Sequence, residues 1–187
     1  MLKKLKFLLK EIDIFMSLYY NIREFYYKYG FTDEEFLKRK FKKNVGRELN
    51  LENPVKFNDK LQWLKLNWYD QLAIKCSDKY AVRDYVREKI GSKYLNELYG
   101  VYESVEEIAI EKLPNQFVLK CTHGSGFNII CKNKNNLNWK KEKKKLKRWL
   151  KMDFYWYSRE WTYKDIEPKI ICEKYLKDKN NNPPNDY

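Results

Sequence analysis

Two short apolar runs near the middle of the chain are separated by a loop that a hydrophobic core does not require. The first run extends from Phe117 to Leu119, and the second from Asn128 to Cys131. Short apolar runs bounded by polar residues and glycines are typical of strands in a hairpin. Lys120, Gly124 and Gly126 stand between them. The pattern therefore predicts two strands joined by a glycine-containing loop.

Helical periodicity dominates the rest of the chain. Residues from about 2 to 43 are predicted to be helical in two or three pieces, broken near Gly30, with Thr32 and Glu35 as a capping box. Further helices are expected at 57–68, at 78–90 and at 139–151, with a short one after Ser104 that Glu107 completes as a second capping box. Extended segments are expected at 94–102 and 169–176. Helices followed by a small sheet indicate the α+β class.

The helix predicted at 57–68 carries an amphipathic stripe of large apolar side chains. The stripe consists of Phe57, Leu61, Leu64 and Trp68, which recur at helical spacing. Such a stripe is far more often part of a core than of a cofactor site, so we expect it to be buried.

Composition narrows the classes of partner. The 187 residues carry a net charge of +13 and have a pI near 9.4, which favours polyanionic partners such as nucleotides, nucleic acids, anionic lipids or acidic glycans. The abundance of Lys, Asn, Ile and Tyr also fits AT-rich coding DNA, which weakens that inference. The four cysteines form no CxxC pair and His123 is the only histidine. We therefore expect free thiols in a reducing cytosol and no metal-ligand spacing.

The N-terminal stretch is amphipathic. Leu2, Leu5, Leu9 and Ile12 share one helical face with lysines beside it. Charged residues interrupt the apolar run and no small-residue cleavage site follows, which argues against a signal peptide. No stretch reaches the roughly 20 apolar residues of a membrane span. Packing on the protein body is the favoured interpretation, and contact with an anionic membrane surface is the alternative.

Two lysines are candidate phosphate ligands. Lys120 precedes the glycines of the predicted loop, where backbone N–H groups can approach phosphate oxygens closely. Lys79 is predicted in the first turn of a helix capped by Ser77, where the helix dipole disfavours a cation unless an anion binds nearby. An ordinary hairpin turn and a solvated lysine are the simpler interpretations. Neither the Walker A motif nor the dinucleotide fingerprint fits, because a strand-like run follows the glycines.

Two further segments are open to more than one interpretation. The aromatic segment from Phe154 to Tyr163 has rings on which a sugar or a base could stack, although burial is the commoner fate. The basic helix from Trp139 to Lys151 is more often a solvated face than a contact with nucleic acid or lipid. Within it, Trp139, Leu146, Trp149 and Leu150 are expected to face inward.

Three motifs in order resemble one family. SDKYAVRDYV, FVLKCTHGSGFNII and PKIICEKYL together resemble the ATP-grasp superfamily, and within it the TupA-like family of teichuronopeptide biosynthesis. Similarity extends over most of the chain from about Phe41 onward, through FKKNVGRELNLENPVKFNDKLQWLKL, YLNELYGVYESVEEI and WTYKDIEPKI. The order and spacing are more specific than any single motif.

The resemblance implies a nucleotide site. Lys79 and Lys120 would be the two nucleotide lysines, and a lid would cover the β- and γ-phosphates. The lid would consist of His123, Gly124, Ser125 and Gly126. The hinge would consist of Glu173, Lys174, Tyr175 and Leu176, with backbone groups of Lys174 and Leu176 reading the adenine edge and Ile171 beside the ring.

The resemblance also implies an activity and its limits. ATP-grasp ligases phosphorylate a carboxylate with ATP and Mg²⁺, and an amine then attacks the acylphosphate. The family's metal ligands follow the hinge, and no acidic pair of that kind stands in this chain. The chain is therefore expected to be the amino-terminal part of a longer fold. Whether it is an enzyme by itself is left open, and no catalytic residue is predicted.

The resemblance suggests a division of the chain into three segments and a role in the cell. Residues 1–45 would be a helical region, 46–110 a helix-rich region, and 111–187 the lid subdomain and hinge, a mostly antiparallel sheet with flanking helices. The expected role is an ATP-dependent carboxylate–amine ligase in bacterial cell-surface polysaccharide synthesis. Its partners would be a nucleotide and a carbohydrate or acidic glycan precursor, in the cytoplasm or at the inner membrane face, with nucleic acid disfavoured. Two alternatives are a glycosyltransferase-like protein and a non-catalytic basic module that binds nucleic acid or anionic membrane.

Overall fold

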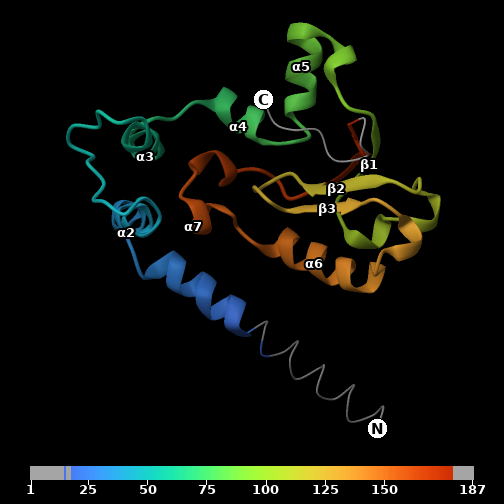
Figure 1. The fold of residues 1–187 in the computed structure, drawn as a ribbon, viewed down its shortest axis with the longest axis horizontal. Helices are drawn as coiled ribbons and strands as arrows, with labels where there is room; N and C mark the ends of the chain where they lie inside the picture. Colours follow the sequence, from blue (N-terminus) through green and yellow to red (C-terminus); the bar gives the residue numbers. More distant parts are fainter. Residues whose placement is uncertain (1–14, 16–17, 179–187) are drawn as a thin grey trace. The chain divides into compact units, whose positions relative to one another are not determined.

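The computed structural model describes residue 15 and residues 18–178, and the chain forms two compact units (Figure 1). Unit 1 contains Met1–Tyr69 with Trp156–Arg159, and unit 2 contains Asp70–Tyr155 with Glu160–Tyr187. These boundaries differ from the expected boundaries after residues 45 and 110. The physical reason is that Leu66, beyond the first expected boundary, packs on the core of unit 1, and a single sheet spans the second.

Unit 2 is built on an antiparallel sheet of four strands among the described residues, in the order β1-β4-β2-β3. The strands are β1 (Leu98–Tyr102), β2 (Phe117–Cys121), β3 (Asn128–Cys131) and β4 (Ile170–Lys174). The predicted hairpin is confirmed as β2 and β3, with Phe117 opposite Cys131 and Lys120 opposite Asn128. The α+β class is confirmed as well. The chain segment that follows the hairpin returns as β4 between β1 and β2, which joins distant parts of the sequence.

The two faces of the sheet differ in character. One face carries Phe117, Leu119 and Cys172, which belong to the main hydrophobic core. On the opposite face, Val118 is paired with Glu173, and Lys120 with Ile171. Because side chains alternate along a strand, Lys120 and Glu173 are placed on the same side of adjacent strands.

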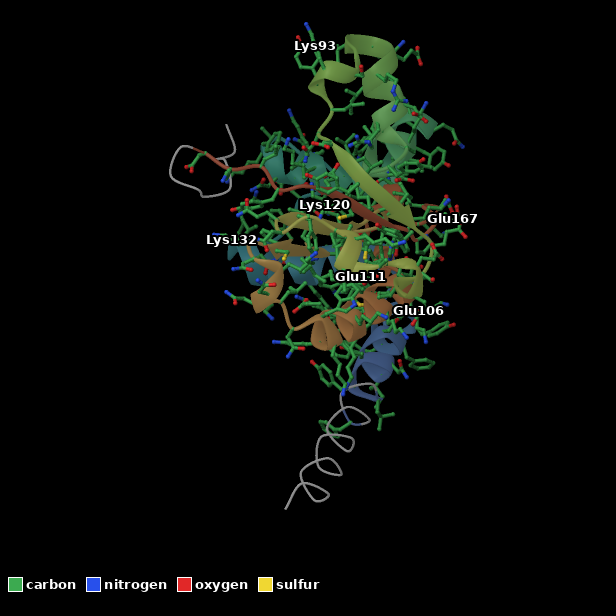
Figure 2. The ribbon with its side chains drawn as sticks, turned by 90° about the vertical axis from the view of Figure 1, so that its right-hand side faces the viewer. Lys93, Glu106, Glu111, Lys120, Lys132 and Glu167 are labelled. Carbon is green, nitrogen blue, oxygen red and sulfur yellow. The ribbon has the colours of Figure 1, made fainter. Side chains whose placement is uncertain are left out.

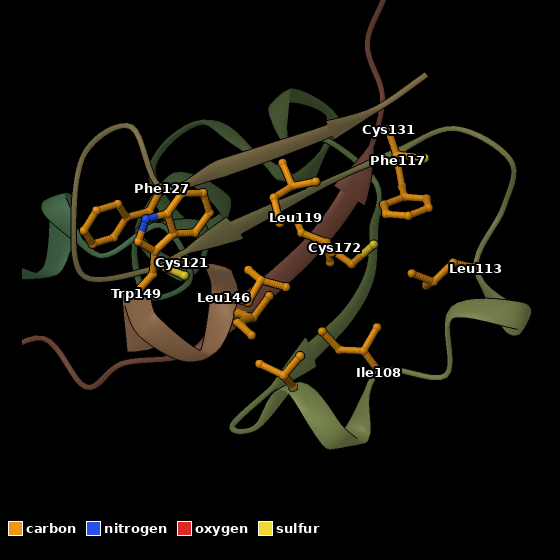
Figure 3. Close-up of a cluster of buried hydrophobic side chains, with 13 residues drawn as sticks. Ile108, Leu113, Phe117, Leu119, Cys121, Phe127, Cys131, Leu146, Trp149 and Cys172 are labelled. Carbon is orange, nitrogen blue, oxygen red and sulfur yellow. The ribbon is translucent and has the colours of Figure 1, made fainter. Parts of the chain in front are cut away.

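Helix α6 (Trp139–Lys151) covers the apolar face of the sheet, with Leu146 and Trp149 buried in the core (Figure 3). Trp139 and Leu150 pack at the edge of this cluster. The predicted bounds and inward-facing residues of the basic helix are therefore confirmed. Short 3₁₀ turns complete this layer, namely η2 (Val105–Glu107), η3 (Ile110–Lys112) and η4 (Lys134–Asn136). The second predicted capping box, that of Ser104 with Glu107, is present at the start of η2.

The remaining helices of unit 2 are α4 (Gln71–Ser77) and α5 (Val82–Ile90), followed by η1 (Ser92–Tyr94), with η5 (Trp161–Tyr163) later in the chain. The prediction that Ser77 caps a helix containing Lys79 is wrong. Ser77 is the last residue of α4, and Lys79 lies in the turn before α5. The side chain of Asp78 accepts hydrogen bonds from the backbone N–H groups of Tyr80 and Ala81, which stabilises that turn in place of a longer helix.

Unit 1 is helical. Residues 18–29 form a helix, and it is followed by α2 (Asp33–Val45), α3 (Phe57–Asn67) and α7 (Tyr155–Ser158), which spans the unit boundary. The capping box of Thr32 and Glu35 at the start of α2 is confirmed, and Gly46 ends the helix in the left-handed conformation with φ 78°. The core consists of Phe36, Leu37, Phe41 and Leu49.

The expected burial of the apolar stripe on α3 is wrong. Phe57 is 72% exposed and Trp68 is 44% exposed. The side of α3 that packs into unit 1 carries Asp59 and Leu66, seven residues apart and so on one helical face. Asp59 is buried because Arg47 donates to both of its carboxylate oxygens. An ion pair therefore takes the place that the apolar stripe was expected to fill.

One prediction about membranes, that no stretch of the chain spans a bilayer, can be compared with the described helices. None of the helices within residue 15 and residues 18–178 has both the length and the apolar character needed to cross a bilayer. The amphipathic stretch from Leu2 to Ile12 lies outside the described residues.

Candidate functional site

Glu173 on β4 is a buried carboxylate held by two cations. Nζ of Lys120 on β2 donates to its Oε2 at 2.7 Å, and the guanidinium of Arg83 on α5 donates to its Oε1 at 2.9 Å. Arg83 also donates to the carbonyl of Asn96 at 2.6 Å. A buried carboxylate needs such partners, since desolvation of an unpaired charge is costly. The arrangement fixes α5 against the polar face of the sheet, with Lys120 near the centre of that sheet (Figure 2).

Lys79 reaches the same region from the turn before α5. Its ammonium donates to the backbone carbonyls of Gly124 and Thr122, the latter at 3.4 Å. Burial lowers the pKa of Lys79, as does the positive charge of Lys120, whereas Cys121, Asp78 and Glu173 raise it. The ammonium is therefore partly removed from water and lies within electrostatic reach of Lys120 and Glu173. The structure thus brings the two predicted lysines together.

The glycine loop between β2 and β3 is anchored at both ends. The N–H of Cys121 donates to the carbonyl of Phe127 at 3.0 Å, which closes the loop. Thr122 is fully buried, and its hydroxyl donates to the carbonyl of Glu167 at 3.0 Å while accepting from the N–H of Lys169 at 2.9 Å. The base of the loop is therefore fastened to the segment that leads into β4.

The two loop glycines have different physical roles. A Cβ on Gly124 would lie 2.9 Å from the ring of Phe127, so this glycine is required by local packing. Gly126 has φ +76°, and a Cβ there would meet nothing within 4 Å. Its backbone is therefore in the region that favours glycine, next to open space. Ser125 between them is exposed.

His123 belongs to the loop by its backbone but to the core by its side chain. The ring is 2% exposed, and Nε2 lies 2.9 Å from the carbonyl of Trp149. Burial lowers the pKa of the imidazole. The side chain therefore packs against α6, and the positive charge of Lys79 is near enough to lower the pKa of the imidazole further.

Backbone groups of the predicted hinge already form hydrogen bonds within the protein. The N–H of Lys174 donates to the carbonyl of Glu97 at 2.9 Å, and its carbonyl accepts from Nδ2 of Asn96 at 2.8 Å. Tyr175 is buried, whereas Leu176 is 50% exposed. The adjacent Ile171 is 1% exposed. An adenine at this strand would thus meet a Lys174 carbonyl that already accepts one hydrogen bond, next to the half-exposed residue Leu176.

Sequence reasoning missed Arg83 and Thr122. Arg83 stands four residues after Lys79 on the predicted helix, a spacing that places both on one side and that could have identified it. Thr122 lies two residues after Lys120, so it continues the strand alternation. Neither residue was singled out, since the partner of Arg83 is 90 positions away and the partners of Thr122 are at least 45 away.

The charges and backbone of this region suit phosphate groups. Lys79, Lys120 and Arg83 contribute three positive charges, against the carboxylates of Glu173 and Asp78. The backbone at Gly126 is open to a large anion. Within residue 15 and residues 18–178, no three histidine, cysteine, aspartate or glutamate side chains gather where they could hold a metal ion.

Comparison with family models gives a match over most of the chain. Residues 59–187 match the family model described as TupA-like ATPgrasp. No curated protein and no solved structure matched the chain. The matched region covers more than half of the 187 residues and contains Lys79, Lys120, the glycine loop and β4. The chain therefore belongs to the TupA-like ATP-grasp family.

Proposed function

We propose that this chain binds ATP through Lys79, Lys120 and the glycine loop, as part of an ATP-dependent carboxylate–amine ligase. One observation carries the proposal. The half-buried ammonium of Lys79 lies against the carbonyls of the glycine loop, within electrostatic reach of Lys120. A desolvated cation of this kind favours a bound anion, and family membership favours a triphosphate.

The proposed chemistry joins a carboxylate to an amine. A carboxylate oxygen attacks the γ-phosphorus of ATP and the bond to the β–γ bridging oxygen breaks, which gives an acylphosphate and ADP. The amine nitrogen then attacks the acyl carbon, phosphate leaves, and the nitrogen loses a proton. Lys79 and Lys120 would neutralise phosphate charge and position it. Magnesium, when bound to ATP, spreads the charge of the phosphates.

The proposed setting is bacterial cell-surface polysaccharide synthesis in the cytoplasm, where ATP is available. The family's role in such synthesis supports it, and an acidic glycan precursor would supply the carboxylate. The glycosyltransferase alternative has less support. The ring of Phe154 contacts those of Phe127 and Tyr163 at centroid distances of 5.4 and 5.0 Å. These rings therefore pack against one another, which leaves less of their surface for stacking on a sugar.

Thermal unfolding with and without MgATP tests nucleotide binding. At a ligand concentration of about 100 times Kd, binding stabilises by about 2.7 kcal/mol, which raises Tm by about 5–10 °C for a chain of this size. Lys120→Ala and Lys79→Ala should remove most of that rise. Lys132→Ala is the matched control, because it removes a charge from an exposed lysine at the margin of the sheet (Figure 2). The same rise in all four proteins, or none in any, would count against the proposal.

A second candidate function is supported by the outer face of α6. Lys140, Lys144, Lys147 and Lys151 are exposed and recur every three or four residues, so they form one row along the helix. Such a row suits a polyanionic surface. Binding of duplex DNA or anionic vesicles that weakens steeply with salt, and that Lys140→Glu/Lys151→Glu abolishes, would favour this function. MgATP binding should be unaffected by that double variant.

A further inference from the structure

Unit 1 contains a cavity of about 520 Å³ whose lining shares no residue with the nucleotide site proposed in unit 2. It lies between the helix at residues 18–29, the start and outer side of α2, and α7. The lining residues are Arg23, Tyr26, Tyr27, Phe31, Phe36, Arg39, Lys40, Lys43, Asn44 and Tyr157. Four of them are cations and five are aromatic, and none is acidic. A cavity of this size can hold one or two sugar rings.

The sequence of α2 explains how the cations come together. Leu37 and Phe41 are four residues apart and face the core of unit 1. Arg39, Lys40 and Lys43 occupy a neighbouring face of the same helix, which lines the cavity. One helix therefore supplies both the core of unit 1 and one charged wall of the cavity.

Aromatic rings hold these cations in place. The guanidinium of Arg39 lies 4.6 Å from the ring centroid of Phe31, and that of Arg23 lies 5.3 Å from the ring of Tyr157. Nζ of Lys40 donates to the backbone carbonyl of Tyr157 at 2.8 Å. Rings orient a cation without cancelling its charge. The guanidinium groups of Arg23 and Arg39 therefore contribute a positive potential to the cavity wall.

Carboxylates outside the lining also act on this region. Glu35 lies within electrostatic reach of Arg39, but its carboxylate accepts from the N–H and the hydroxyl of Thr32. Glu24 lies close enough to Tyr157 to influence the pKa of the phenol. Neither residue lines the cavity, so the lining itself keeps an excess of positive charge.

Two buried polar atoms of the lining lack a hydrogen-bond partner among the described residues. They are Nε of Arg23 and the hydroxyl of Tyr157. Burial, followed by the charge of Glu24, raises the pKa of Tyr157 to about 12, so the phenol is a neutral donor. Buried polar groups in proteins nearly always have a partner, and each exception calls for one. Both unpaired atoms belong to the same cavity, which points to a ligand with oxygen acceptors.

We propose that this cavity binds an acidic saccharide, that is, a sugar ring carrying a carboxylate or a phosphate. The cations match the anionic group, the aromatic rings match the apolar faces of the sugar, and the unpaired donors match its oxygens. A neutral sugar would leave the cations unmatched, and inorganic phosphate would leave the rings uncovered. The proposal deepens the proposed function and rests on it for the choice of a saccharide, because that function names an acidic glycan precursor as the substrate.

Calorimetric titration of the full chain at low salt, without nucleotide, tests this site. Glucuronate and glucose 1-phosphate represent the two anionic groups, and glucose and inorganic phosphate are the partial ligands. Both sugar anions or one of them should bind, with each partial ligand at least roughly tenfold weaker, because each lacks one of the matched groups. Binding of the carboxylate alone or of the phosphate alone identifies which anion the cavity takes.

Two variants and a matched control locate the binding. Lys43→Gln removes an exposed lining charge and should weaken binding roughly tenfold, since a charge-assisted hydrogen bond is lost. Lys42→Gln is the control, because this exposed neighbour pairs with Glu48 and does not line the cavity. Tyr157→Phe should also weaken binding roughly fivefold while leaving the Tm of the free chain equal or higher, because it deletes a buried hydroxyl without a partner.

Four outcomes would overturn the proposal. They are the absence of binding by both sugar anions, equal binding of inorganic phosphate, equal effects of Lys42→Gln and Lys43→Gln, and loss of binding in Lys120→Ala with full binding in Lys43→Gln. The last result would place the ligand in unit 2. Failure of the proposed nucleotide function is distinguishable, since it would remove the MgATP effect on Tm and leave sugar-anion binding dependent on Lys43.

Discussion

The guanidinium of Arg83 donates to Oε1 of Glu173 at 2.9 Å although 90 residues separate them in sequence. The pair connects α5 to the central strand β4, and Lys120 occupies the other carboxylate oxygen. Both charges of the pair are largely removed from solvent. The relationship therefore ties the packing of α5 to the position of the lysine that is proposed to contact ATP.

Removal of the guanidinium should destabilise unit 2 strongly. Arg83→Met leaves the buried carboxylate of Glu173 with Lys120 alone, and breaking a buried pair costs about 3–5 kcal/mol. Urea unfolding should show a lower midpoint. The double variant Arg83→Met/Glu173→Leu should recover much of the loss, because it leaves no buried unpaired carboxylate. Lys38→Met, which breaks an exposed pair with Glu34, should leave the midpoint unchanged. A double variant no more stable than the single one would contradict this account.

The stability of the chain should depend on the protonation of Lys79. Its folded pKa lies below the ordinary value of 10.5, mainly through burial. Between the folded pKa and 10.5 the unfolded chain binds more protons than the folded chain, so this group makes stability rise with pH. Urea midpoints of the wild type and of Lys79→Met, measured from about pH 8 to 10.5, should therefore diverge in favour of the wild type. The urea midpoint of the control variant Lys132→Met should change with pH in the same way as that of the wild type.

The same lysine should couple ATP binding to proton uptake. A bound phosphate favours the charged ammonium and raises the pKa of Lys79. Titrations of MgATP at a pH above the folded pKa, in buffers of different ionisation enthalpy, should show protons taken up on binding. Lys79→Arg should bind without that uptake, since arginine stays charged. Uptake that persists in Lys79→Arg would assign it to another group.

Elements with a local cause were predictable from the sequence. Thr32 and Glu35 define the start of α2, and the start of α6 follows from Asn138, whose side chain accepts from the N–H of Lys141. The hairpin strands followed from their apolar runs, and Lys120 was singled out because a cation beside a glycine loop is unusual locally. Lys79 was singled out for a helix start that the structure does not show, since it lies in the turn before α5.

Features fixed by distant contacts were not predictable in the same way. The apolar residues of α3 gave a correct helix but a wrong face, since the ion pair of Arg47 and Asp59 decides which side packs. Strand alternation places Thr122 on the side of Lys120 but does not show its role, because its hydrogen bonds are made to residues 45 to 47 positions away. Pairing of β4 between β1 and β2 likewise depends on register across the chain.

The four cysteines should differ sharply in reactivity. Cys76 is exposed, whereas Cys121, Cys131 and Cys172 are buried and all four are free thiols. Burial raises the pKa of Cys121 and of Cys172 to about 12, so their reactive thiolate forms are scarce at neutral pH. A thiol-reactive chromophore should modify one cysteine rapidly in the folded chain and four after unfolding. Cys76→Ser should abolish the rapid phase, and a rapid phase that remains would show that a buried thiol is accessible.

Thr122 should control both the stability of unit 2 and the glycine loop. Thr122→Val keeps the shape of the buried side chain but removes the hydroxyl that bonds Glu167 and Lys169. The backbone carbonyl and N–H left behind lose a partner, which costs about 1–3 kcal/mol. Because the base of the loop is then less firmly held, the MgATP-induced rise in Tm should shrink as well. Ser125→Ala, in the exposed part of the same loop, should leave stability unchanged. A normal MgATP effect in a destabilised Thr122→Val would show that Thr122 supports the fold without positioning the loop for nucleotide.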